Sequence, residues 1–148
     1  MRFIMQLIIF VIFVKISTKK LLLFSLRCRK GNHMARVISI VNQKGGTGKS
    51  ACTANLAVGL AQKNMKVLIV DADPKSDVSA GFGYRDCDDS NETLAALMDA
   101  VMKDEDIPSD CYIRHQAEGI DIICSNIGLA GTEVQLVNAM SREYVLKQ

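Results

Sequence analysis

A segment rich in glycine and lysine, residues 42–50 with the letters NQKGGTGKS, has the residue types and spacing of a phosphate-binding loop. A polyphosphate needs several converging donors, and backbone N–H groups supply them where glycine keeps side chains out of the way. Lys49 can place its ammonium group on the phosphates, and the Ser50 hydroxyl can complete the coordination shell of Mg²⁺. The pattern is G-x-x-x-x-G-K-[ST] except at its first position, which is Gln43. The candidate nucleotide contacts are Gly45, Gly46, Thr47, Gly48, Lys49, Ser50 and Ala51.

Two carboxylates follow the next apolar run along the chain. Asp71 and Asp73 come directly after residues 67–70, and Pro74 then restricts the backbone of Asp73 to an extended form. Ligands bind at the carboxyl ends of strands in open parallel sheets, where a carboxylate could orient an attacking water or hold a water bound to Mg²⁺. We interpret both as candidate catalytic residues; the alternative is a pair of loop acids that only solvate the strand end.

The elements expected around these residues alternate between strand and helix. Apolar runs predict strands over residues 36–42, 67–70 and 120–124, and amphipathic patterns predict helices over residues 48–63, 91–102 and 132–147, with a loop over residues 72–90. The first helix carries Cys52, Leu56 and Leu60 on one face at four-residue spacing, and the last is expected to point Val134, Val137, Met140 and Tyr144 inward. This order predicts the α/β class, with a parallel sheet of the P-loop NTPase type and flanking helices.

Charge divides the chain into two parts. The 148 residues carry a net charge of +2, but residues 1–33 hold seven basic side chains and no acid. Residues 34–148 therefore hold 11 basic and 16 acidic side chains, a net charge of −5. The overall positive charge is thus no argument for nucleic-acid binding, and the composition excludes a collagen-like or broadly disordered chain.

The basic and apolar segment 1–33 has two interpretations. Its apolar run, residues 3–14, is shorter than the about 20 residues that span a bilayer, and no small-x-small cleavage site follows it. We interpret the segment as upstream sequence before a start at Met34, or else as a targeting or membrane-anchoring segment.

Five cysteines lie far apart without a C-x-x-C pair, which favours free thiols in a reducing cytoplasm over disulfides or zinc.

A second lysine, Lys44, stands just ahead of the double glycine and marks the deviant form of the Walker A motif. With it the sequence resembles the ParA/MinD family of partition ATPases, in the ParA-like branch with its N-Q-K-G-G-x-G-K-[ST] loop. The resemblance implies that Lys44 acts in trans, on the phosphates of the partner in a nucleotide-sandwiched dimer. It also implies that Asp73 serves hydrolysis with Asp71 in support, because the family carries D-x-D-P-Q there.

The sequence departs from the family at two site positions and in length. Lys75 replaces the glutamine of that segment, and Ala51 replaces a hydroxyl residue, from which we expect weaker affinity at most. The resemblance covers residues 35–148, and the family continues with a strand that ends in a Walker B aspartate and packs beside the phosphate-loop strand. We therefore expect a chain truncated before that strand, marginally stable and a poor ATPase, in which residues 37–41 pair badly.

The resemblance implies an ATP-binding and ATP-hydrolysing switch in plasmid or chromosome partitioning, with ATP and Mg²⁺ as cofactors. Its implied partners are a second copy bound through ATP, a centromere-binding protein and non-specific DNA, with membrane contact only if residues 1–33 are functional. One alternative is a truncated nucleotide-binding fragment without activity. The other is an ATP-dependent reductase like the nitrogenase iron protein, although Cys87, Cys111 and Cys124 do not lie in glycine-rich loops.

Overall fold

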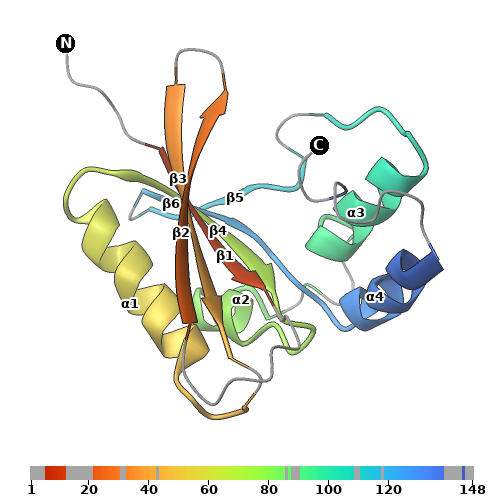
Figure 1. Cartoon of the computed structure of the whole chain (residues 1–148), viewed down its shortest axis with the longest axis horizontal. Helices are drawn as coiled ribbons and strands as arrows, with labels where there is room; N and C mark the ends of the chain where they lie inside the picture. The colour runs from red at the N-terminus through yellow and green to blue at the C-terminus, as the bar shows by residue number, and fades with distance from the viewer. Residues whose placement is uncertain are drawn as a thin grey trace.

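The computed structural model describes residues 6–12, 22–30, 33–42, 44–85, 87, 91–108, 111–117, 119–138 and 145. Within these residues one six-stranded sheet has the order β2-β3-β1-β4-β6-β5 (Figure 1). The strands are β1 Gln6–Ile12, β2 Leu22–Lys30, β3 His33–Val41, β4 Lys66–Ala72, β5 Arg114–His115 and β6 Ile120–Ile123. The four inner strands run parallel, while β2 and β5 pair antiparallel at the edges. The predicted α/β class is confirmed, with the two antiparallel edges as the difference from an all-parallel sheet.

Helices cover both faces of this sheet (Figure 1). They are α1 Lys49–Ala61, α2 Asp77–Gly81, α3 Leu94–Met102 and α4 Gly128–Asn138. In β4, Val67 and Ile69 belong to the core cluster under α1 and α2, whereas Val70 belongs to the cluster under α3 and α4. The apolar run of β4 is continuous because successive side chains enter opposite cores.

The predicted helices are present, but two of their faces differ. α1 buries Lys49, Thr53 and Ala57, and Cys52 is exposed. Thr53 and Ala57 are small, so the helix packs closely on the sheet, and the Thr53 hydroxyl is satisfied by donating to the Lys49 carbonyl at 2.9 Å. Of the expected stripe, Leu56 and Leu60 are half-buried and pack against the core beside this face, whereas Cys52 is exposed.

α4 begins at Gly128, four residues before the predicted start. Its buried side chains are Leu129 and Thr132, and Val134, which we expected to point inward, is 68% exposed. The inward face of α4 is the stripe of Leu129, Thr132 and the half-buried Leu136, which differs from the predicted stripe. The side chains of Val137, Met140 and Tyr144 lie outside the described residues. Residues 72–90, expected to be a loop, contain the short helix α2.

β1 lies inside the sheet, although it comes from the segment 1–33. It pairs parallel with β3 on one side and β4 on the other, so that Phe10 is opposite Ser39 and Val70. β2 pairs with the other side of β3. The expectation that residues 37–41 would pair badly is not met, because β3 has a neighbour on each side. Among the residues that the structure describes, no helix is long and apolar enough to cross a bilayer.

Candidate functional site

The phosphate loop joins β3 to α1 at the carboxyl edge of the sheet. Gly46 and Gly48 have φ angles of 69° and 81°, in the left-handed region that side chains rarely adopt. Gly48 is also the residue before the first turn of α1, and a Cβ atom placed on either glycine would point into open space. The loop therefore presents bare backbone, next to the N–H groups at the start of a 13-residue helix.

Hydrogen bonds between residues close in the sequence stabilise the conformation of this loop. The backbone N–H of Lys44 donates to Oδ1 of Asn42 at 2.9 Å, and the Thr47 hydroxyl donates to the Lys44 carbonyl at 3.2 Å. The Asn42 side chain is buried, so the start of the loop is anchored at the end of β3. Gln43 lies outside the described residues.

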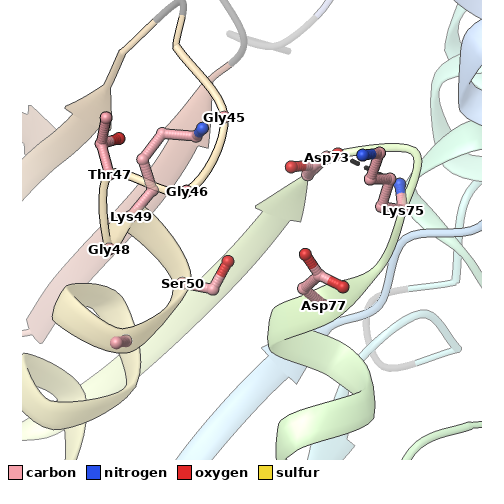
Figure 2. Close-up of a pocket in the computed structure, with 10 residues that line it drawn as sticks. Gly45, Gly46, Thr47, Gly48, Lys49, Ser50, Asp73, Lys75 and Asp77 are labelled. Atoms are coloured by element: carbon pink, nitrogen blue, oxygen red, sulfur yellow. Dashed lines mark hydrogen bonds between the residues drawn. The ribbon is translucent and has the colours of Figure 1, made fainter.

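A cavity of about 370 Å³ lies between the loop and the carboxyl end of β4 (Figure 2). It is lined by Gly45, Gly46, Thr47, Gly48, Lys49, Ser50, Ala51, Asp73, Lys75 and Asp77. Every predicted nucleotide contact lines it, together with Asp73. Lys44 and Asp71 do not. Lys75 and Asp77 were not predicted as site residues, although they closely follow Asp73 in the sequence.

Lys49 and Lys44 differ in their surroundings. Lys49 is only 7% exposed, and its side chain extends along the loop toward Gly45 (Figure 2). Lys44 is exposed. A buried ammonium group beside bare backbone N–H groups makes the loop wall of the cavity suited to an anion.

Oxygen atoms gather across the cavity from the loop. Ser50, Asp73 and Asp77 lie around the space between α1 and α2 (Figure 2). Asp73 is 8% exposed, and its Oδ1 accepts the Lys75 N–H at 3.1 Å. One hydroxyl and two carboxylates are the hard oxygen donors that Mg²⁺ prefers, so the residues present fit a magnesium ion bound with a polyphosphate.

Asp71 lies behind the cavity rather than in its wall. Its side chain is fully buried, and burial raises the pKa of its carboxyl above the ordinary value. Oδ2 accepts the backbone N–H of Ser79 at 2.9 Å and the Ser79 hydroxyl at 2.7 Å, while Oδ1 accepts the Asp73 N–H at 3.2 Å. The carboxylate is thus occupied by the protein's own backbone and side chains.

The three cysteines considered for the reductase alternative do not form a cluster. Cys87 and Cys124 are buried in the core under α1, where burial raises the pKa of Cys124 to about 12, and Cys111 is exposed. Within the described part of the chain, no group of three or more His, Cys, Asp or Glu side chains could hold a metal ion.

A family model matches most of the chain. The model AAA_31, described as an AAA domain, matches residues 35–148. The chain belongs to this family. Among curated relatives, Soj of Bacillus subtilis, a sporulation initiation inhibitor protein, is 36% identical over 115 residues, which are 78% of this chain and 44% of Soj. The chromosome partitioning protein ParA of Caulobacter vibrioides is 33% identical over 112 residues, 76% of this chain and 40% of that protein. The predicted resemblance to ParA/MinD-like partition ATPases is confirmed.

Solved structures share the fold. Cobyrinic acid a,c-diamide synthase from Mycobacterium smegmatis, solved with a bound ATP analog and magnesium, has a TM-score of 0.62 at 23% identity, covering 97% of this chain and 44% of that one. Apo McdA from Cyanthece has a TM-score of 0.54 at 22% identity, covering 90% and 38% of the two chains. This AAA_31 chain spans less than half the length of these curated relatives and structures.

Proposed function

We propose that this protein binds ATP with Mg²⁺ in the cytoplasm and hydrolyses it as a ParA-type switch in plasmid or chromosome partitioning. The observation that carries the proposal is the cavity shared by the phosphate loop and Asp73. Relatives that partition chromosomes and a structure with a bound ATP analog and magnesium support it. Activity and partners are proposed for the whole protein, because this chain spans less than half the length of these relatives.

Binding would come mainly from the loop wall of the cavity. The backbone N–H groups around Gly46 and Gly48 and the first turn of α1 would donate to phosphate oxygens. Lys49 would add a positive charge that is already largely desolvated, so it would lose little further hydration on meeting a phosphate. The Ser50 hydroxyl would hold Mg²⁺, which when bound neutralises phosphate charge and fixes the orientation of the phosphate oxygens.

Hydrolysis would depend on the opposite wall. Asp73 faces the cavity and accepts a hydrogen bond from its own loop, which leaves carboxylate oxygen capacity for a water molecule. It would orient that water for attack on the terminal phosphate, a step in which the protein contributes positioning and charge stabilisation.

Dimerisation through bound ATP is part of the same proposal. Lys44 is exposed and does not line the cavity, which supports contact with a second copy. A centromere-binding protein and non-specific DNA would be further partners, as in chromosome partitioning.

Replacing the buried loop lysine tests the proposal. Lys49→Ala removes a charge-assisted contact worth about 1.5–3 kcal/mol, so we expect at least about tenfold weaker binding of a fluorescent ATP analogue in the presence of Mg²⁺. Lys63→Ala is the matched control, because Lys63 is an exposed lysine just beyond the end of α1. Equal affinities for the two variants, or no binding by the unaltered chain, would contradict the proposal.

A further inference from the structure

The two oxygens of the Asp71 carboxylate hold both ends of one short segment. Oδ1 accepts the N–H of Asp73, the first residue of the segment, and Oδ2 accepts the N–H of Ser79, its last. Between them lie Lys75 and Asp77, which face the cavity with Asp73. One buried carboxylate therefore binds both ends of the segment 73–79 through hydrogen bonds.

The Ser79 hydroxyl extends this arrangement to the next strand. It donates to Oδ2 of Asp71 at 2.7 Å and accepts the backbone N–H of Ser125, just beyond β6, at 3.1 Å. Asp71, Ser79 and Ser125 are all 0% exposed, so water cannot replace these hydrogen bonds. The carboxyl ends of β4 and β6 are thus joined through one hydroxyl group of α2.

We infer that Asp71 is a positioning residue, which with Ser79 sets where Asp73 and Asp77 stand in the cavity. Asp71 does not line the cavity, so it acts through the backbone N–H groups that it accepts. For nucleotide chemistry this inference rests on the proposed function. It differs from a direct role in the reaction, because the carboxylate never needs to reach a phosphate, a water molecule or a metal ion.

Two substitutions remove different parts of the arrangement. Ser79→Ala removes the hydroxyl and keeps the backbone N–H of Ser79 on Asp71. Asp71→Asn keeps the size of the side chain but replaces one acceptor oxygen by a donor. Ser76→Ala is the matched control, since Ser76 lies in the same segment and its side chain caps no helix amide.

The first measurement is amide hydrogen exchange in the full chain, which needs no nucleotide. We expect about tenfold faster exchange of the Ser125 N–H in Ser79→Ala and of the Asp73 N–H in Asp71→Asn, beyond any change shared by the whole sheet. Ser76→Ala should leave both unchanged. Unchanged exchange at Asp73 and Ser125 in the two test variants would overturn the inference.

The second measurement is ATP affinity with and without Mg²⁺. Asp73 and Asp77 stand on the wall suited to the metal, whereas the phosphate loop stands opposite. We therefore expect Asp71→Asn to reduce the gain in affinity that Mg²⁺ provides several-fold while ATP affinity without metal stays the same. A loss of equal size in both conditions would overturn the positioning role. A wild-type chain that binds no ATP would contradict the proposed function, and the exchange measurement would still decide the inference.

Discussion

Lys44 and Lys49 belong to one loop, yet their surroundings differ. Lys49 is buried along the inner side of the loop, and Lys44 is exposed and absent from the cavity wall. Only the former can contact a nucleotide within the same chain without a rearrangement of the loop. A charge at the position of Lys44 is available to a second molecule.

Lys44→Ala should therefore separate binding from association. We expect the affinity for Mg²⁺–ATP to stay within about twofold, because the charge of Lys44 is exposed to solvent and does not line the cavity. Association in the presence of a non-hydrolysable ATP analogue, measured by sedimentation velocity, should be lost. Lys63→Ala serves again as the exposed lysine control. A tenfold loss of affinity in the Lys44 variant would place its ammonium group in its own cavity instead.

At the residue scale, the candidate contacts from Gly45 to Ala51 could be predicted because they are consecutive and their chemistry is local to the loop. Asp77 and Ser79 could not be predicted as site residues, because the short helix α2 places them near the cavity. This helix has five residues, and its sequence is too short to show a period. Asp71 was predicted as a site residue because of its place at a strand end. Its burial and its three hydrogen bonds follow from tertiary contacts.

At the scale of elements, β1 and β2 differ in the number of neighbours. β1 pairs with β3 and β4, and β2 pairs with β3 alone. In an internal strand, the N–H groups of successive residues all have partners, on alternating sides. In an edge strand, every second N–H points away from the sheet.

Proline substitutions at neighbouring positions test this difference. Ile8→Pro and Ile9→Pro should both lower the free energy of unfolding, by about 1–3 kcal/mol or more, because each removes a ladder hydrogen bond. Of Ser25→Pro and Leu26→Pro in β2, one should have a clearly smaller effect. Urea unfolding of the full chain gives all four values. Two unaffected β1 variants would show that residues 6–12 do not form an internal strand.

The element predictions came closest to the structure around the phosphate loop and Asp71. The strand before the phosphate loop, the helix after it and the strand before Asp71 have nearly their predicted bounds. β1, β2 and β5 were not predicted. β1 pairs with strands distant in the sequence, β2 belongs to the segment that we interpreted as upstream or targeting sequence, and β5 has two residues, too few to show a period. The start of α4 was misplaced because Gly128 and Gly131 gave no apolar signal for its first turn.

At the scale of the whole molecule, two cores flank one sheet, and Cys124 is buried in the core under α1. Burial raises the pKa of its thiol from the ordinary value of 9.0 to about 12. A group whose pKa is raised by folding stabilises the folded state below the unfolded pKa. That stabilisation is lost as the pH rises from 9.0 toward 12, because the unfolded thiol then releases its proton first.

Alkaline pH should therefore destabilise the wild-type chain more than Cys124→Ser. Between pH 8 and pH 10 we expect the free energy of unfolding of the wild type to fall by about 1 kcal/mol more than that of the variant. Urea unfolding under reducing conditions measures both, and the subtraction removes the contributions of lysines and tyrosines. Parallel pH profiles of the two proteins would show that Cys124 titrates normally in the folded state.

The position of β1 between β3 and β4 has a consequence for the spacing of the two cavity walls. Among the described strands, β3, which precedes the phosphate loop, and β4, which precedes Asp73, do not pair with each other, and each pairs with residues 6–12 instead. Neighbouring strands lie about 4.8 Å apart, so β1 accounts for about 9.6 Å between β3 and β4. Among the described residues, no other strand lies between β3 and β4, so residues 34–148 alone would lack the strand that separates them. A deletion or a disruptive substitution within residues 6–12 therefore bears on the spacing of the two cavity walls, although these residues do not line the cavity.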